Sequence, residues 1–208
     1  MPFPTTNATQ ELPAINQILA SVGQAPVTTL DQTNPDVAIA YDTLLQVSRE
    51  VQAEGWTFNK EEHYEFTPDT NDEILIPNNI LQITLSNNGA NVDFDGIRRS
   101  GKLYDRHNHT YKWKDHTNPV ECDIVWEFDW VDIPTPIQDF IVARSAVLVS
   151  SRIVGDPGQY QMLQSAEAYQ RAIAMEYECN QGDYTFFGQP NASTNNYISY
   201  KPYKALYR

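Results

Sequence analysis

The sequence of 208 residues lacks any long apolar run, and its mean hydropathy is −0.50. A membrane-spanning helix needs about 20 consecutive apolar residues, so none is expected here. Residues 1–7 carry neither a positive segment nor an apolar core, so we expect no secretory signal. With 41% hydrophobic and 20% charged residues, the chain should form a soluble globular protein with one sizeable core, or a core and a smaller lobe.

Basic residues are scarce: Lys and Arg number 14 against 27 acidic residues, which gives a net charge of −13. A protein that grips nucleic acid needs cations to neutralise phosphates, so this shortage argues against a tight DNA-binding surface. An acidic wall can still face DNA that has to slide past without being held. Solubility explains the same charge more simply, and composition alone leaves both interpretations open.

Only two cysteines are present, Cys122 and Cys179, and they lie far apart without the spacing of a metal site. Cys122 falls in a strand-like run and Cys179 at the end of a helix-like run. We expect two reduced and mostly buried thiols, as is usual for a protein made in a reducing cytosol. The sequence alone does not exclude a disulfide between them.

Motifs of the common catalytic sites are absent, since there is no G-x-x-x-x-G-K-[ST], no G-x-G-x-x-G and no G-x-S-x-G. The acidic pairs Glu61–Glu62 and Glu127–Asp129 could serve a two-carboxylate glycosidase. That mechanism needs two carboxyl groups at a defined separation across a cleft, of which the sequence gives no sign. We therefore expect no enzyme and no cofactor.

Two of the four histidines, His107 and His109, alternate along the chain. On a strand both rings would share a face with Asp105, and such a group could bind zinc. No further ligand follows at a usual spacing, and Arg106 and Lys112 make the surroundings basic. Exposed histidines are therefore the favoured interpretation, and we expect no metal site.

Apolar residues at helical spacing predict four helices, at residues 11–22, 35–53, 136–154 and 159–179. Gly23 and Gly55 would end the first two helices, and Asn34 would cap the second. The third segment is apolar nearly all round, as expected for the central helix of a bundle. The fourth carries one apolar stripe, made by Met162, Ala166, Tyr169, Ile173 and Tyr177.

Between residues 56 and 131 the pattern changes to alternation and turn residues, which predicts short antiparallel strands. Residues 74–77 and 80–85 indicate two strands, and residues 102–105 are expected to pair with 110–113 as a hairpin. The clearest strand is 121–131. Its buried face would carry Cys122, Ile124, Trp126, Phe128 and Trp130. Its solvent face would carry Glu121, Asp123, Glu127 and Asp129.

These patterns together predict an α+β fold. It would be a small four-helix bundle of two N-terminal and two C-terminal helices, with an inserted antiparallel β-rich lobe and an extended C-terminal tail. Residues 1–55 and 132–180 would form the bundle, 56–131 the lobe and 181–208 the tail. At the passage from bundle to lobe, Trp56 and Phe58 are predicted to anchor the lobe by burying apolar area.

The last stretch, Asn180 to Arg208, is rich in Asn, Gly, Ser and Tyr and poor in aliphatic residues, so it cannot make a core of its own. Tyrosines combine a large contact area with a hydrogen-bonding tip, which suits a tail that becomes ordered against a partner. A frayed terminus is the alternative. The predicted binding residues of this tail latch are Tyr197, Tyr200, Tyr203, Lys204 and Tyr207.

Four stretches follow one another in a set order and spacing: Glu11-Leu-Pro-Ala-Ile and onward to Leu30, Gly55-Trp-Thr-Phe-Asn59, Tyr104-Asp-Arg106 and Met175-Glu-Tyr-Glu178. In these stretches the chain resembles tail tubular protein A, the head-to-tail adaptor family of short-tailed phages of the autographivirus type. The first stretch is the most specific. Together they span the chain from Glu11 to about Tyr184.

The resemblance implies a structural protein of the virion, made in the host cytoplasm and placed in the short tail, without membrane contact. It implies a homo-oligomeric ring of twelve copies between the portal protein and the tail nozzle (tubular protein B), with the tail fibres as further partners. DNA would pass through the lumen during ejection without specific binding. A tail-associated glycan hydrolase that uses carboxylates of the β region, and a monomeric binding module, are the alternatives.

Overall fold

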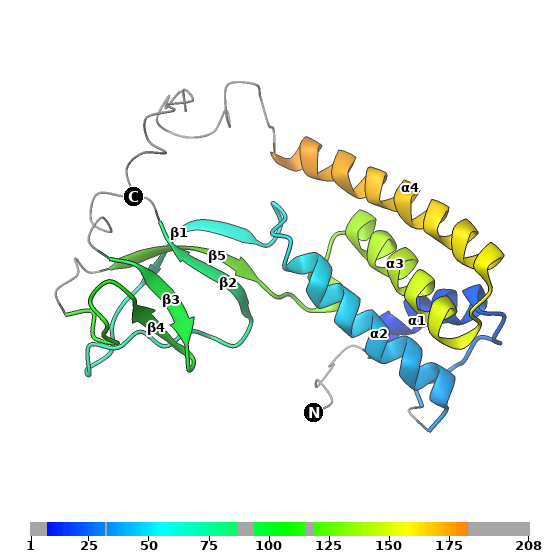
Figure 1. The fold of residues 1–208 in the computed structure, drawn as a ribbon, viewed down its shortest axis with the longest axis horizontal. Helices are drawn as coiled ribbons and strands as arrows, with labels where there is room; N and C mark the ends of the chain where they lie inside the picture. Colours follow the sequence, from blue (N-terminus) through cyan, green and yellow to red (C-terminus); the bar gives the residue numbers. More distant parts are fainter. Residues whose placement is uncertain (1–7, 32, 87–93, 115–118, 183–208) are drawn as a thin grey trace.

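The computed structural model describes residues 8–31, 33–86, 94–114 and 119–182. Over these residues the chain is α+β, as predicted, with helices at one end of the molecule and antiparallel strands at the other (Figure 1). The elements are α1 (Ala8–Ser21), α2 (Pro35–Gln52), β1 (Lys60–Phe66), β2 (Ile80–Leu85), β3 (Gly96–Arg99), β4 (Lys102–Asp105), β5 (Val120–Trp126), the 3-10 helix η2 (Trp130–Asp132), α3 (Thr135–Ile153) and α4 (Pro157–Gly182). The two ends of the described chain therefore meet in one helical region.

Helix α3 lies at the centre of that region and contacts α1, α2 and α4. Its Ile137, Phe140 and Ile141 are fully buried, as the apolar run in the sequence predicts. Helix α2 begins as predicted, because the Asn34 side chain accepts a hydrogen bond from the N–H of Asp36 at 3.0 Å. None of the helices in the described ranges combines the length and the apolarity that crossing a membrane demands.

Helix α1 starts earlier than the sequence predicts. It begins at Ala8, so Pro13 lies inside the helix and not in its first turn. A proline there cannot donate the hydrogen bond to the carbonyl four residues back. The helix nevertheless continues, because Ile15 and Ile18 are completely buried against the helical core and stabilise it.

The larger sheet has the strand order β1-β5-β2 and is antiparallel, with β5 in the middle. Buried and partly exposed side chains alternate along β5 from Val120 to Ile124, as predicted, and Val125 after them is buried as well. The strand ends at Trp126, however, so the prediction of a strand to residue 131 is wrong. Beyond Trp126 the backbone groups of Phe128 bond to a side chain of α2 and not to a neighbouring strand.

The smaller sheet is the hairpin β3–β4, whose two turn residues, Ser100 and Gly101, have φ values of 52° and 74°. Positive φ at both positions gives the twist that a two-residue hairpin needs. The predicted pairing of residues 102–105 with 110–113 is wrong, because β4 pairs with β3. The later segment contributes an isolated bridge between Asp105 and Thr110.

The predicted strand at residues 74–77 is also wrong. Leu75 makes an isolated bridge to Lys102, and the N–H of Leu103 donates to the carbonyl of Ile74 at 2.9 Å. Pro77 has no N–H with which to continue a ladder, so the segment stays too short for a strand. Ile74 and Ile76 of this segment are nevertheless buried in the core between the larger sheet and the hairpin.

Two groups of buried apolar side chains hold the molecule together. One lies among the helices and includes Ile15, Leu44, Val47, Phe140 and Ile141. The other lies between the larger sheet and the hairpin and includes Phe66, Ile80, Leu103, Trp113 and Ile124. The predicted domain division at residues 55/56 and 131/132 stays a prediction, because it concerns how each part folds on its own.

Candidate functional site at the junction of the helices and the sheet

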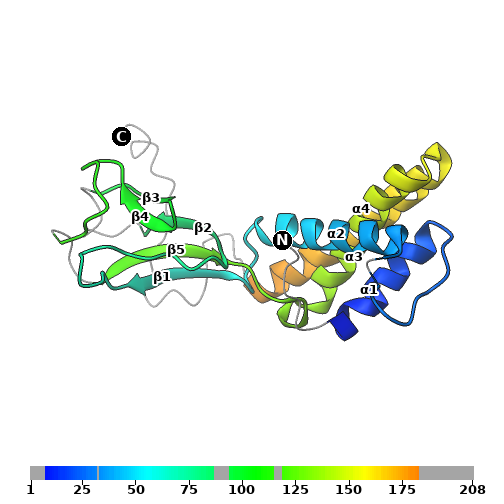
Figure 2. The same cartoon turned by 90° about the horizontal axis from the view of Figure 1, so that it is seen from below.

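The chain crosses between the helices and the larger sheet twice, after α2 and after β5, and the two crossings lie side by side (Figures 1 and 2). At the first crossing Gly55 has a φ of 78°, which favours glycine. A Cβ at this position would also lie 3.3 Å from Cγ2 of Val125 in β5. Gly55 therefore allows both the turn after α2 and the close approach of that turn to the sheet.

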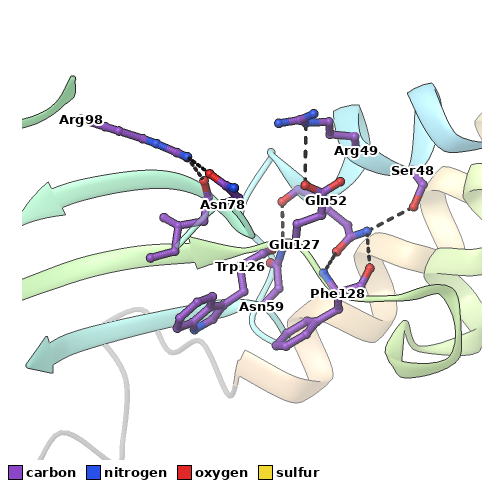
Figure 3. Close-up of polar contacts among 10 residues, drawn as sticks. Ser48, Arg49, Gln52, Asn59, Asn78, Arg98, Trp126, Glu127 and Phe128 are labelled. Atoms are coloured by element: carbon purple, nitrogen blue, oxygen red, sulfur yellow. Dashed lines mark hydrogen bonds and ion pairs between the residues drawn. The ribbon is translucent and has the colours of Figure 1, made fainter. Parts of the chain in front are cut away.

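Gln52, in the last turn of α2, binds the second crossing. Its Oε1 accepts a hydrogen bond from the N–H of Phe128 at 2.8 Å, and its Nε2 donates to the carbonyl of Phe128 at 3.2 Å (Figure 3). The same Nε2 donates to Oγ of Ser48 at 3.1 Å. The side chain of Gln52 is buried, and it gives the backbone of Phe128 the partners that a neighbouring strand would give within a sheet.

Asn59, just before β1, connects the two crossings from the other side. Its Oδ1 accepts from the N–H of Trp56 at 2.9 Å, and its Nδ2 donates to the carbonyls of Gln52 at 2.9 Å and Trp126 at 2.8 Å. The N–H of Trp126 returns a hydrogen bond to the carbonyl of Asn59 at 2.8 Å. A buried amide bonded in this way fixes the backbone around it and leaves no polar atom of its own unpaired.

Longer polar side chains continue the junction toward its surface (Figure 3). Gln82 of β2 donates to the carbonyl of Ala53 at 2.6 Å, which ties the sheet edge to the end of α2. Arg98 of the hairpin donates to the carbonyl of Ile80 at 2.6 Å. Arg49 lies 3.8 Å from the carboxylate of Glu127, an exposed pair that adds little energy.

The two predicted anchor residues lie on the helical side of the junction. Trp56 is 3% exposed, packs in the helical core, and donates from Nε1 to the carbonyl of Val51 at 2.7 Å. Phe58 is half-buried against the same core, and its ring centroid lies 6.2 Å from that of Phe128. Their role as anchors of the β-rich lobe stays a prediction.

Helix α4 contacts the junction through its C-terminal part. The carboxylate of Glu178 accepts hydrogen bonds from the N–H of Thr57 at 3.0 Å and from its hydroxyl. Arg171 pairs with Glu54 at 3.1 Å and lies over the ring of Phe140. The helix end therefore reaches the residues that lead into β1.

The outward side of α4 is a second feature of interest. Of its 26 residues only Ala174 and Gly182 are buried. Among the residues that the structure describes, nothing covers the first half of the apolar stripe predicted for this helix, where Met162 is 76% and Tyr169 is 67% exposed. Exposed apolar side chains aligned on a long helix are typical of a contact surface.

Glu11, in the first turn of α1, has a buried carboxyl group near Asp129 of the second crossing. It is 3% exposed, and among the described residues its Oε2 has no hydrogen-bond partner. Burial raises the pKa of Glu11; a hydrogen bond with Tyr41 opposes the rise, and the nearby charge of Asp129 adds to it. Burial therefore disfavours the ionised form of Glu11.

The predicted carboxylate pairs of a glycosidase have other partners in the structure. Glu61 accepts a hydrogen bond from Nε1 of Trp126 at 2.9 Å, and Glu62 pairs with Lys60 at 2.8 Å. Glu127 lies beside Arg49 at the junction. Asp129 stands at the start of η2 without a side-chain cap bond.

His107 and His109 do not lie on a strand, as the zinc-site alternative requires, because β4 ends at Asp105 and a turn follows. The carboxylate of Asp105 organises this turn by accepting from the N–H of His107 and from the side chain of Asn108. Burial alone raises the pKa of Asp105, but these bonds and the N–H of Asp95 outweigh it and leave the pKa lowered. Within the described ranges no three His, Cys, Asp or Glu side chains are placed to hold a metal ion.

The two cysteines differ in their surroundings. Cys122 is buried, and burial followed by the charge of Asp123 raises the pKa of its thiol to about 12. Cys179 is exposed, so the expectation that both thiols are mostly buried is wrong for it. Both are free. The predicted latch residues Tyr197, Tyr200, Tyr203, Lys204 and Tyr207 lie outside the described residues.

The sequence patterns do not indicate a role for the junction residues Gln52 and Asn59. One signal was present, because Ser48 and Gln52 are four residues apart on the same side of α2 as the apolar Val51 and Leu44. Polar side chains on the buried side of a helix need partners elsewhere. Nothing in the sequence identified Phe128 as that partner.

Comparison with known proteins gives the class. A family model described as "Tail tubular protein" matches residues 12–184, which include both crossings, all the strands and most of each helix. The chain belongs to the tail tubular protein family, and it is a structural protein of a phage tail. It is similar to tail tubular protein A of Klebsiella phage KP34, with 28% identity over 173 residues, covering 83% of this chain and 89% of the relative. The resemblance seen in the sequence is confirmed.

Proposed function

We propose that this chain is a subunit of an adaptor ring of twelve copies, seated between the portal protein and the tail nozzle, through which DNA passes during ejection. Membership of the tail tubular family supports a place in the tail. The ring of twelve copies, its contacts with the portal protein and the tail nozzle, and the passage of DNA go beyond that membership. In this view the tail fibres contact the β-rich part from outside.

The observation that carries the proposal is the uncovered apolar side of α4. Helix α4 buries only two of its 26 residues. The exposed apolar side chains of Met162 and Tyr169 would gain from being removed from water. A neighbouring copy packed on this side would cover them. We infer that the four helices act as one bundle around α3, with α4 as the wall that meets the next subunit.

The charge of the chain supports the passage. Acidic residues outnumber basic ones by 27 to 14, so a lumen lined by these subunits would repel phosphates. DNA would then move through without being held. We propose no catalytic step: of the carboxylates considered for hydrolysis, Glu61 accepts a hydrogen bond from Trp126 and Glu127 lies beside Arg49.

The test is electron microscopy of the pure chain mixed with its portal. Rings seated on the portal are expected for the natural sequence. The double variant Met162→Glu and Tyr169→Glu should reduce seated rings at least tenfold, since burying two new carboxylates at an interface is strongly unfavourable. Thr70→Glu, an exposed change in a loop of the β-rich part, should leave ring number unchanged.

Two results would oppose the proposal. A natural chain that never forms a ring on the portal would remove the adaptor function. Rings of normal number from the double variant, with the variant folded by circular dichroism, would show that α4 is not the contact between subunits.

A further inference from the structure

Basic residues are few in this chain, yet they gather on one part of it. Six of the 14 lie between residues 98 and 114, and that stretch contains a single acid, Asp105. The six are Arg98, Arg99, Lys102, Arg106, Lys112 and Lys114. The charge of this stretch is opposite in sign to that of the whole chain, so it attracts anions that the rest of the surface repels.

The register of the hairpin β3–β4 places part of this charge on one exposed face. Arg99 stands directly opposite Lys102 in the ladder, and an isolated bridge sets Leu75 opposite Lys102 on the other side. Residues directly opposite one another in antiparallel segments share a face. Leu103, the neighbour of Lys102 in β4, is completely buried, whereas Leu75 is 62% exposed. The face that carries Arg99, Lys102 and Leu75 therefore points to solvent.

The same face continues onto the segment that follows the hairpin. Glu73 precedes Leu75 by two residues and shares its side, and a second isolated bridge sets Lys112 opposite Glu73. Glu73 is paired with Lys102 at 2.5 Å. Within the described ranges neither Arg99 nor Lys112 has an ion-pair partner, and both are exposed. We call the outward side of β3, β4 and residues 73–75 and 110–112 the basic face; it presents two uncompensated cations.

The side chain of Arg99 is restrained by ring contacts. Its guanidinium lies 4.2 Å from the ring centroid of Tyr104, and Tyr104 meets Tyr111 edge to face at 4.8 Å. An arginine restrained in this way loses less side-chain freedom on binding an anion than one that moves freely in water. A planar guanidinium also donates two parallel N–H bonds to the oxygens of one phosphate. Arg99 is therefore well prepared to bind a phosphate.

The basic face lies apart from the helices. Strands β3 and β4 belong to the sheet end of the molecule, whereas α4 belongs to the helical end (Figures 1 and 2). In the proposed ring, a neighbour packed on the exposed first half of α4 would therefore not cover the basic face.

We propose that the basic face contacts the phosphate backbone of duplex DNA. The inference rests on the proposed function, because it names the surface of each subunit that would meet the DNA in transit. Arg99 and Lys112 would each neutralise a phosphate, and neither contact depends on the base sequence. Charges more than about 10 Å apart are largely screened at 0.1 M salt, so distant acids do not cancel this attraction. Two contacts give weak binding, which allows the DNA to move on.

An acidic protein is the other partner that such a face could take. It is less favoured, because the fully buried centre of a protein interface is mostly apolar. On the basic face Leu75 is exposed, but its neighbours across the segments are Lys102 and, two residues away, Glu73. A polyanion needs no apolar centre. Binding to an acidic polypeptide is therefore included below as an outcome that counts against the proposal.

The test measures binding of the pure chain to a short, fluorescently labelled DNA duplex by anisotropy, between 50 and 200 mM NaCl. The double variant Arg99→Gln and Lys112→Gln should bind at least tenfold more weakly at the lowest salt. The slope of log K against log salt should become smaller by about 1.8, because each phosphate contact contributes about 0.9. The matched control, Arg49→Gln and Lys60→Gln, removes the same charge from exposed positions elsewhere and should stay within twofold of the natural chain.

Urea unfolding checks that the variants are folded. If the double variant unfolds at a lower urea concentration than the natural chain, Lys112→Gln alone carries the test, and its slope should be smaller by about 0.9. Three results would overturn the proposal: no binding of the natural chain to the duplex at 50 mM NaCl, equal binding by the double variant and its control, or binding of the natural chain to polyglutamate but not to DNA.

The measurement needs neither the portal nor a ring, so its failure is distinguishable from failure of the adaptor function. Rings on the portal without DNA binding by the chain would leave the adaptor and remove this contact. DNA binding without rings would leave the contact and remove the adaptor. The double variant should also seat on the portal in normal number. A folded double variant that fails to seat would assign the basic face to a contact between proteins.

Discussion

At the scale of single residues, Glu11 shows how burial changes the behaviour of an ordinary carboxyl group. It stands near the start of α1, where a negative charge is usually favourable because of the helix dipole. Here its side chain is buried near Tyr41 and Asp129, and the loss of water dominates. Folding therefore favours the protonated form of Glu11 over the ionised form.

We predict that Glu11→Gln stabilises the protein at neutral pH. The folded pKa of Glu11 is raised above the unfolded value of about 4.3, so the ionised group weakens folding above its folded pKa. Below about pH 4 the group is protonated in both states and the penalty disappears. The difference in unfolding free energy between variant and natural chain should be largest at pH 7–8 and shrink toward pH 4.

Urea unfolding at a series of pH values measures this difference. Glu176→Gln, at an exposed position on α4, is the matched control and should change stability by less than roughly 0.5 kcal/mol at every pH. A Glu11→Gln difference that stays constant from pH 4 to pH 8 would contradict the assignment.

At the scale of elements, the crossing after β5 depends on the end of α2. We predict that Gln52→Leu destabilises the protein by about 1–3 kcal/mol, because it leaves the N–H and the carbonyl of Phe128 without partners. Gln46→Leu, on the exposed side of the same helix, should have an effect within roughly 0.5 kcal/mol. Chemical denaturation followed by tryptophan fluorescence distinguishes them, and equal effects would show that the bonds to Phe128 contribute nothing.

The elements that the sequence predicted well are those whose signals are local. Helix α2 combines an Asn34 cap, a proline at its first position and apolar spacing, so both its ends were placed within one residue. The alternation of β5 is equally clear over residues 121–124. These features need no knowledge of what packs against them.

The secondary-structure predictions are wrong where a residue distant in sequence determines the local structure. The pattern that continues past Trp126 looks like a strand, but Gln52, 76 residues away in sequence, takes the hydrogen bonds of Phe128. The hairpin was paired with the wrong segment, although the dipeptide Ser100-Gly101 is a recognised two-residue turn. The polar junction could not be predicted at all, because Gln52 and Asn59 gain their role only when both crossings are adjacent.

At the scale of the whole molecule, the tail beyond the described helices provides a further prediction. Deleting residues 185–208 should leave a subunit that folds normally, since both cores lie within residues 14–174. We expect this subunit to fail to assemble on the portal, because it lacks the tyrosines and Lys204 of the predicted latch.

Circular dichroism and urea unfolding would confirm that the shortened chain is folded, and electron microscopy of the mixture with portal would count seated rings. A full-length variant with Tyr197, Tyr200, Tyr203 and Tyr207 changed to Ala separates the side chains from the length of the tail. Seating of the shortened chain at the natural level would refute the latch.

The bond between Glu178 and Thr57 gives the molecule a mechanical linkage. Thr57 lies on the first crossing, and the second crossing is tied to it through Asn59 and Gln52. Because the two crossings are tied together, bending of the chain at one crossing is opposed by the other. In the proposed ring, a neighbour that tilted α4 would therefore pull on the first crossing through Glu178 and Thr57, and would act on the sheets as well as on the helices.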